Sequence, residues 1–356
     1  MLCTTTNAQS QGDDTLQNAI LQWQQVVQQE KTRVLLNAKK IYRVTNEAEL
    51  IVALKKAGKK GGVVLLQNGI YRIYRSLQIP SRVTLRGTHQ DSTQLHVYIK
   101  APFAQQESGK RAGAVVMKKV THAGVENLTI QYKAAAFEPN DKDSLHAEWD
   151  RTVFHVQEMR DTMLFVDLVL IDSAENCWIK NCKLLWAGND PVHITASKYI
   201  TCSGNYVDRA YNKSDRGQGY YNIIRSSHVL VQGDTIRRLR HFSIHRGAQY
   251  VVVQNCYLEV DINFHSGDGG YNLVYGNTIR IPQWHSWNAI SRGDPNQHQP
   301  PGPFNLLVDN NFTNKNGRKI ASQPGVTYRM NEQWQGSAFY LWLHLPAVWE
   351  QIFFIP

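Results

Sequence analysis

The sequence has few residues of the kind that cross-link a fold or hold a metal. Its 356 residues include only 5 cysteines, and no Cys-x-x-Cys motif or paired Cys/His spacing occurs. This argues against a zinc site or a redox motif and predicts cysteines that pack in the interior. Helix-turn-helix, RNA-binding and zinc-finger signatures are also missing, so nucleic acid is not an expected partner despite a formal net charge of +10.

A continuous apolar run that could cross a membrane is missing as well. The segment from Ala338 to Pro356 is rich in aromatic residues and leucine, but a proline and a glutamate interrupt it. We therefore expect residues 316–356 to form a C-terminal cap or an irregular tail, with no membrane association. Residues 1–12 resemble the end of a secretory signal, or a tail, which predicts a secreted or periplasmic protein.

What the sequence does contain is a repeated run of three strand-like residues. The runs begin at Cys177, Ile200, Val229, Val251, Asn272 and Asn305. Three residues after the last member of each run comes a small or polar residue, namely Cys182, Asn205, Asp234, Cys256, Asn277 or Asn310. The steps between equivalent positions are 23, 29, 22, 21 and 33 residues. A repeat of this length with alternating apolar residues predicts a stacked solenoid.

The length of the repeat selects one kind of solenoid. It is too short for a pair of helices and fits one turn of a parallel β-helix, in which each coil covers its neighbour. The recurring polar residue suits a tight turn, because Asn and Asp tolerate the left-handed backbone conformation. Cys182 and Cys256 share this turn position three coils apart, about 14 Å at the spacing of strands, so a disulfide between them is not expected. We expect one continuous domain over residues 41–315.

Two helical segments precede the repeats. Asp14 or Thr15 can cap a helix over about residues 16–36, whose apolar residues recur at helical spacing. Because a solenoid exposes its end coils, we expect this capping helix, within residues 13–40, to cover one of them. A second, shorter helix is expected over residues 47–57.

Several motifs resemble a known fold family. Residues 61–71 read Gly-Gly-Val-Val-Leu-Leu-Gln-Asn-Gly-Ile-Tyr, and residues 79–87 read Ile-Pro-Ser-Arg-Val-Thr-Leu-Arg-Gly. Later coils contain Asn181-Cys182-Lys183-Leu184 and Gly276-Asn277-Thr278-Ile279. At these residues the chain resembles the pectate lyase-like superfamily. The resemblance covers about residues 40–315 and implies an all-β fold, a single-stranded right-handed parallel β-helix.

The resemblance leaves the reaction open, because fold and function separate on such scaffolds. The superfamily includes lyases of acidic polysaccharides, uronate epimerases, glycoside hydrolases and phage tailspikes. Some related lyases use calcium, but this sequence shows no dedicated acidic cluster. We therefore assign no metal and no cofactor.

The outward face of the predicted coils carries several histidines. Six, six, five and six places before Tyr199, His228, Tyr250 and Tyr271 come His193, Asn222, His245 and His265. Alternation along the two strands that end in His245 and His265 directs Phe and Ile inward and the polar residues outward. We therefore expect three imidazoles and one amide to stack in a single rank. Charged residues expected around this rank include Arg225, Arg240, Arg246 and Asp268.

Two long steps in the repeat predict loops beside the rank, since inserted residues must bulge from the coil. Their candidate substrate-binding residues are Lys213 and Arg216 in the first insertion, which also contains Tyr220, and Trp284 and Trp287 in the second. Trp and Tyr offer flat faces to sugar rings, and Lys and Arg bind carboxylates or sulfates. Loops that only pack against the coil are the alternative. With the positive net charge, this predicts an acidic polysaccharide as partner of a monomeric protein.

The chemistry that fits these residues is β-elimination on a uronic acid by a polysaccharide lyase. The enzyme must neutralise the carboxylate, remove the weakly acidic C5 proton and help the 4-linked oxygen to leave. Histidine suits proton transfer near neutral pH. We predict His245 as the base and His265 or Tyr220 as the acid. The residues predicted to hold the substrate are Arg240, Arg246 and Asn222, which would bind the carboxylate, together with His193 and Asp268.

Three alternatives stay open. A uronate C5-epimerase is suggested by Asp190-Pro191-Val192-His193, which is similar to the Asp-Pro-His motif of alginate epimerases apart from the inserted valine. A glycoside hydrolase would need two carboxylates flanking one bond, for which Asp190, Asp261 and Asp268 are candidates. A non-catalytic glycan-binding solenoid would need the aromatic loops but not the histidines.

Overall fold

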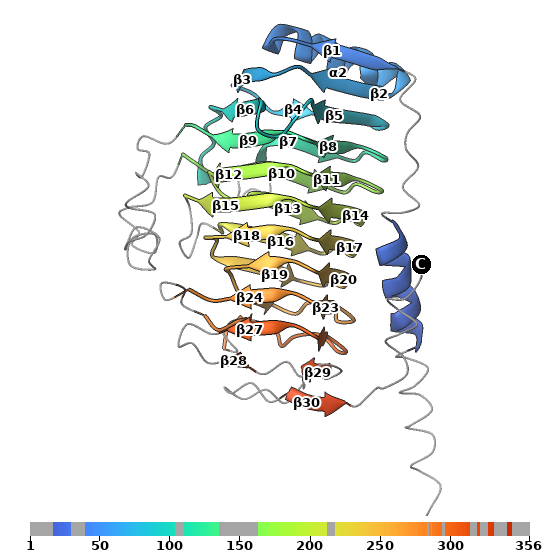
Figure 1. Cartoon of the computed structure of the whole chain (residues 1–356), viewed down its shortest axis with the longest axis vertical. Helices are drawn as coiled ribbons and strands as arrows, with labels where there is room; N and C mark the ends of the chain where they lie inside the picture. Colours follow the sequence, from blue (N-terminus) through green and yellow to red (C-terminus); the bar gives the residue numbers. More distant parts are fainter. Residues whose placement is uncertain are drawn as a thin grey trace, which may run out of the picture.

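The computed structural model describes residues 17–29, 40–103, 110–134, 163–211, 218–282, 285, 287–293, 296–313, 319–320, 327–330 and 340–343. Strands dominate these residues and form three long sheets, which we call sheets A, B and C. Successive strands of the chain go to sheets A, B and C in turn, so the backbone winds as a right-handed parallel β-helix (Figure 1). The predicted fold class is confirmed.

The bounds of the strands show how short each one is. Sheet A contains β1 (Ile41–Val44), β2 (Gly62–Leu66), β5 (Val83–Gly87), β8 (Gly124–Glu126), β11 (Trp178–Lys180), β14 (Lys198–Ser203), β17 (Ser227–Gln232), β20 (Gln249–Gln254), β23 (Leu273–Tyr275), β26 (Leu306–Val308), β29 (Thr327–Met330) and β30 (Tyr340–Leu343). Sheet B contains β3 (Gly69–Ile73), β6 (Thr93–Val97), β9 (Thr129–Tyr132), β12 (Lys183–Ala187), β15 (Tyr206–Ala210), β18 (Thr235–Arg237), β21 (Tyr257–Leu258), β24 (Thr278–Arg280), β27 (Asn311–Thr313) and β28 (Lys319–Ile320). Sheet C contains β4 (Leu77–Gln78), β7 (Ala112–Lys118), β10 (Val166–Asp172), β13 (Val192–Thr195), β16 (Tyr220–Ile224), β19 (His241–His245), β22 (Ile262–His265) and β25 (Ile290–Arg292).

The winding changes at its C-terminal end. Every pairing up to β26 and β27 is parallel, whereas β28 and β29 pair antiparallel with these two strands, and β30 pairs antiparallel with β29. These three strands begin at Lys319, within the segment for which a cap or an irregular tail is predicted.

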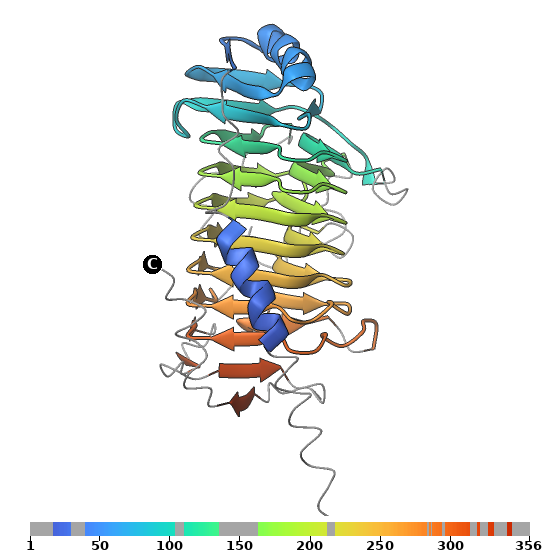
Figure 2. The same ribbon diagram turned by 90° about the vertical axis from the view of Figure 1, so that its right-hand side faces the viewer.

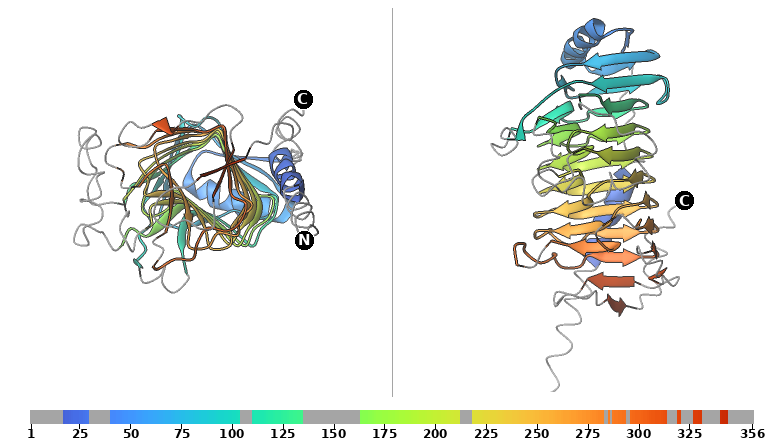
Figure 3. Two further views of the ribbon diagram at one scale, coloured as in Figure 1. Left: turned by 90° about the horizontal axis from the view of Figure 1, so that it is seen from below. Right: turned by 90° about the vertical axis from the view of Figure 1, so that its left-hand side faces the viewer.

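The coils stack around a common axis, as the view from below shows (Figure 3). The main hydrophobic core fills the space that they enclose. Its inward side chains stack in ranks, and one rank in sheet A consists of Val64, Leu85, Val125, Ile179, Cys202, Val231, Val253, Val274 and Leu307. The last six are the third members of the runs found in the sequence. All nine are fully buried, so the repeat predicted the register of the coils correctly.

The recurring polar residue after each run has a different role from the one predicted. The left-handed backbone falls on the residue before it, as at Gly204 (φ 65°) and Gly233 (φ 64°). The side chain instead accepts a hydrogen bond from the coil before: Asn205 Oδ1 from the Cys182 backbone at 3.0 Å, and Asp234 Oδ1 from the Asn205 backbone at 2.8 Å. It forms a buried ladder that binds coil to coil, and the glycine, asparagine or aspartate before it makes the tight turn.

The cysteines of the coils pack in the interior. Cys177, Cys182, Cys202 and Cys256 are buried free thiols. Burial raises the pKa of Cys177 to about 11 and that of Cys182 to about 12, so both stay protonated at physiological pH.

Two helices cover the solenoid, and the structure corrects the position predicted for the first. The helix at residues 17–29 lies along the outer side of sheet A, not over an end (Figure 2). Its Trp23 belongs to an apolar cluster with outward side chains of four coils, including Leu230 and Leu273, and donates a hydrogen bond to the Tyr271 carbonyl at 2.7 Å. An apolar strip on the outside of sheet A, unusual for an exposed face, accounts for this position.

The N-terminal end of the coil is covered instead by α2 (Glu47–Lys60). Asn46 caps this helix by accepting a hydrogen bond from the Glu49 backbone, and its Leu50 and Leu54 join the main core. In the described part of the chain, neither helix is long and apolar enough to cross a membrane.

Candidate functional site

The candidate site lies on the outward face of sheet C. Along β13, Val192 and Ile194 point into the core, so His193 and Thr195 point outward. The same alternation in β16, β19 and β22 turns Asn222, His245 and His265 to this face, as predicted.

These outward residues form two neighbouring ranks, not the single rank predicted. His193 pairs with Asn222, and the next coils continue this rank with Ser243 and Asn263. Three buried oxygens along it, Asn222 Oδ1, Ser243 Oγ and Asn263 Oδ1, have no hydrogen-bond partner among the described residues. The second rank lies two positions further along each strand and contains Ile224, His245 and His265.

Turns of unequal length explain this error. His228 follows Ile224 by four positions, Tyr250 follows His245 by five, and Tyr271 follows His265 by six. Counting back a nearly constant number of residues from sheet A therefore mixes the two ranks.

One end of the first rank is built around a buried arginine. Arg111 Nε and one terminal nitrogen bind both oxygens of Asp167, at 2.8 and 2.9 Å, and the same terminal nitrogen contacts Asp190 Oδ2 at 3.0 Å. Burial by itself raises the pKa of Asp167, but Arg111 outweighs it and holds the carboxyl below its usual pKa. The other terminal nitrogen of Arg111 donates to Gln218 at 3.0 Å. A bidentate pair of this kind fixes the carboxylates in position.

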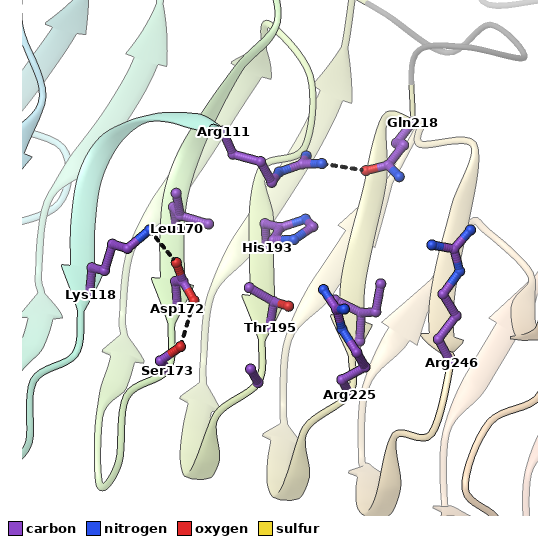
Figure 4. A pocket seen from close by; sticks show the side chains of 12 residues that line it. Arg111, Lys118, Leu170, Asp172, Ser173, His193, Thr195, Gln218, Arg225 and Arg246 are labelled. Carbon is purple, nitrogen blue, oxygen red and sulfur yellow. Dashed lines mark hydrogen bonds and ion pairs between the residues drawn. The ribbon is translucent and has the colours of Figure 1, made fainter. Parts of the chain in front are cut away.

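His193 is oriented by this cluster. Its Nδ1 lies 2.9 Å from Asp190 Oδ2, and the Asn222 amide contacts the same two atoms at 3.3 and 3.2 Å. A carboxylate at Nδ1 favours the tautomer with the proton on that nitrogen, which leaves Nε2 able to accept one. No described residue bonds to Nε2, and the ring lies in a pocket (Figure 4). His193, predicted only to bind substrate, is the imidazole best placed for proton transfer.

The pocket is a basic groove of about 590 Å³ over β7, β10, β13, β16 and β19. Its charged lining residues besides His193 are Arg111, Lys118, Arg225, Arg246 and Asp172. Lys118 pairs with Asp172 at 2.7 Å, and Arg111 is neutralised by the carboxylates behind it. Arg225 and Arg246 make no ion pair or hydrogen bond through their side chains to any described residue. They follow adjacent strands, so two uncompensated guanidinium groups face this groove.

The predicted base, His245, is poorly suited to that role. Burial, together with the nearby His265 and Arg246, lowers the pKa of His245 to about 2. Burial and the nearby His298 lower the pKa of His265 to about 3, and its Nδ1 lies 3.2 Å from His245 Nε2. Both imidazoles are therefore neutral at physiological pH and are weak proton acceptors.

A second carboxylate cluster lies further along the coil. Asp261 is fully buried, and its oxygens lie 2.9 Å from His241 Nδ1 and from His285 Nε2. Burial alone would raise the pKa of Asp261, but His241 and His285 outweigh it, so the carboxylate stays ionised. This arrangement rigidly holds the His241 ring, which packs against Trp287 at 4.2 Å between centroids.

Tyr220 and Arg240 belong to this second cluster. The Tyr220 ring lies 5.1 Å from His241, and its backbone nitrogen donates to Asp190 at 2.8 Å. The Arg240 guanidinium lies over the rings of Tyr220 at 5.7 Å and Trp287 at 5.6 Å. Tyr220 thus connects the two carboxylate clusters.

Asp268, predicted to bind substrate, is engaged in hydrogen bonds within the chain. Its carboxylate accepts hydrogen bonds from the backbone of Gly270 and Gly302 and from the side chains of Asn272 and Asn305, all between 2.9 and 3.0 Å. These bonds tie the segment ahead of β26 to the turn after β22. Lys213, Arg216 and Trp284 lie outside the described residues.

Four site residues were not predicted from the sequence, namely Arg111, Asp167, Gln218 and His241. Arg111 comes 56 positions before Asp167 and no local pattern marks it. The sequence did contain one signal for this cluster, which is the short separation of Asp190 and His193. Asp190 precedes His193 by three positions, and its carboxylate lies beside the imidazole ring. In the described part of the chain, no group of three or more His, Cys, Asp or Glu side chains is arranged to hold a metal ion.

Comparisons with known proteins bear on the fold. No family model and no curated protein matches the chain. Similar solved structures include the polygalacturonase from Erwinia carotovora ssp. carotovora, at 11% identity and a TM-score of 0.43, covering 75% of this chain and 81% of that one. Jun a 1, the major allergen from cedar pollen, shows 14% identity and a TM-score of 0.43 over 88% of this chain and 86% of its own. A thermostable pectate lyase shows 12% identity and a TM-score of 0.41 over 88% and 90%. At these values the likeness concerns the winding of the backbone and assigns no reaction.

Proposed function

We propose that this protein is an enzyme that acts on an acidic polysaccharide, and that it is a lyase that cleaves a uronate linkage by β-elimination. The observation that carries the proposal is the His193 ring, oriented by Asp190, in a groove with two uncompensated guanidinium groups. The chemistry needs a base for a weakly acidic proton next to a carboxylate that must be neutralised. The groove supplies both.

In the proposed reaction, Arg225 and Arg246 bind the uronate carboxylate and stabilise the charge that develops on it. His193 Nε2 removes the C5 proton, and the Asp190 carboxylate stabilises the resulting imidazolium through Nδ1. The C5 electron pair forms the C4–C5 double bond as the bond to the 4-linked oxygen breaks. Tyr220, which connects the two clusters, gives the leaving oxygen its proton.

The carboxylates of the site disfavour the hydrolase alternative. A glycosidase needs one protonated carboxyl group as acid. Asp167 and Asp261 both have a pKa below the usual value, since Arg111 outweighs burial at the first and His241 and His285 outweigh it at the second. Burial raises the pKa of Asp268, but four hydrogen bonds from the chain occupy its carboxylate.

The experiment is incubation with polygalacturonate, alginate, glycosaminoglycans and ulvan, followed by ultraviolet absorbance of the unsaturated product. We expect turnover of at least one polymer and a loss of about 10²-fold or more in kcat for His193→Ala. His89→Ala, at an exposed turn, is the matched control and keeps full activity. New reducing ends without absorbance would mean a hydrolase, an altered uronate configuration without cleavage would mean an epimerase, and binding alone would mean a non-catalytic solenoid.

A further inference from the structure

An exposed aromatic platform lies at the N-terminal end of the solenoid, away from His193. The rings of Tyr74 and Tyr98 stack with their centroids 5.3 Å apart at 20°. Tyr74 is 67% exposed, the largest value among the exposed large apolar residues of the described chain. Among the described residues, Tyr98 provides the one ring contact of Tyr74.

The platform borders a second groove of about 520 Å³ between α2 and the first coil. Its wall is largely apolar, with Ile51, Val52 and Leu77 beside Tyr74. Arg72 and Arg75 also line it, and both are exposed. Arg75 makes no ion pair or hydrogen bond through its side chain to a described residue, whereas Arg72 lies near Glu47, which lines the same groove.

This second groove lies at the N-terminal end of the coil, and the first begins one coil further along. Leu77 of β4 lines the second groove, Lys118 of β7 lines the first, and β4 pairs directly with β7. His193 on β13 lies three coils from β4, or about 14 Å at the spacing of strands in a sheet. One extended polymer chain can therefore contact both grooves.

We propose that Tyr74 and Tyr98 form a stacking subsite for a sugar ring of an acidic polysaccharide, with Arg72 and Arg75 binding its anionic groups. The polymer that reaches this subsite also passes over His193, so its chemical class depends on the proposed function. Aromatic rings offer the flat apolar face that a sugar ring covers, and guanidinium groups match carboxylates and sulfates.

The charges around the platform disfavour a second copy of the chain as occupant. The second half of α2 carries the exposed Lys55, Lys56, Lys59 and Lys60, and its first turn carries Glu47 and Glu49 near Arg72. With Arg72 and Arg75, positive charges outnumber negative ones among these residues. Two such ends would repel each other, whereas a polyanion is attracted. Strand addition at the edge of β3 is hindered as well, because Glu47 already accepts a hydrogen bond from the Arg72 backbone at 2.7 Å.

The test measures binding without turnover, in the His193→Ala background, by affinity electrophoresis in gels containing polygalacturonate, alginate or chondroitin sulfate. Tyr74→Ala is expected to weaken the dissociation constant for the bound polymer about three- to tenfold, and Tyr74→Phe, which keeps the ring, to bind normally. Ile70→Ala, on the strand β3 that Tyr74 directly follows and 49% exposed, is the matched control and changes nothing. Arg75→Ala should weaken binding mainly at low salt.

Equal binding by the parent and Tyr74→Ala, or no binding of any of the three polymers by the parent, would overturn the subsite. So would a dimer in light scattering that Tyr74→Ala abolishes, because it would identify a self-association surface. Tyr74-dependent binding without any unsaturated product from the wild type would support the subsite and refute the lyase.

Discussion

At the scale of single residues, the site depends on one carboxylate with several partners. Asp190 is fully buried, and it contacts Arg111, His193, Asn222 and the Tyr220 backbone within 2.8 to 3.2 Å. Such a carboxylate orients the imidazole and stabilises its protonated form without touching the substrate. Asp190 is therefore a positioning residue in the proposed mechanism.

Replacing Asp190 with asparagine tests this role. An amide keeps the shape but removes the negative charge beside Nδ1, so we expect kcat to fall about 10²-fold. Because the imidazolium loses its counter-charge, the acidic limb of the kcat/KM profile should move to lower pH. Asp91→Asn, at an exposed turn, is the control. A fall in activity with an unshifted pH profile would mean that Asp190 only maintains the structure.

At the scale of elements, the turn ladder contains one carboxylate among amides and thiols. Asp234 is fully buried between Asn205 and Cys256, and burial raises its pKa to about 7. Between about pH 4 and pH 7 the unfolded chain releases a proton that the folded chain keeps. The contribution of Asp234 to the free energy of unfolding is therefore greatest in acid and is lost as the pH rises through this window.

Asp234→Asn should consequently stabilise the protein above neutral pH. The new amide can accept a hydrogen bond from the Asn205 backbone and donate one to a backbone carbonyl of the previous coil. Asn277 and Asn310 donate such bonds to the carbonyls of Val253 and Val274, at 2.9 and 2.8 Å. We expect a gain of about 2 kcal/mol in the free energy of unfolding at about pH 8, and little gain at about pH 4. Urea titrations at both pH values measure it. Asp309→Asn, an exposed carboxylate in an equivalent turn, should change neither value. An equal gain at both pH values would contradict the account.

At the scale of the whole molecule, stability is distributed along the axis, because each coil contacts its immediate neighbours. The helix at residues 17–29 is the exception, since it contacts β17, β20, β23 and β26 together. Its Trp23 is fully buried on this apolar strip. The helix therefore couples four coils that otherwise interact only in pairs.

Trp23→Ala should cost about 3–5 kcal/mol, as large-to-small substitutions of buried aromatic residues do. The loss should be local: hydrogen exchange is expected to speed up in β17 to β26 but not in β2 and β5. Leu21→Ala removes an apolar side chain that is 56% exposed on the same helix and should leave exchange unchanged. Uniform acceleration along the whole coil would show that the solenoid unfolds as one unit and refute the local coupling.

The sequence alone predicted the architecture, because the winding of a β-helix follows from short patterns that recur in every coil. Each run places inward residues such as Ile179, Cys202 and Val231 at the same position of every coil, and neighbouring coils stack them directly. The spacing also identified the face of the site, since alternation along β13 and β19 is a property of the strand itself.

What only the tertiary structure decided is how that face is assembled. The turns between sheets C and A differ in length by one or two residues from coil to coil. A shift of two residues along a strand keeps a side chain on the same face but moves it to the neighbouring rank. For this reason His245 and His193 lie in different ranks. Arg111 and Asp190 lie 79 positions apart and meet only because the coils stack. The protonation of His245 likewise follows from burial, which no local pattern encodes. Local periodicity determines the winding of this chain, whereas the chemistry of its site arises from contacts between coils.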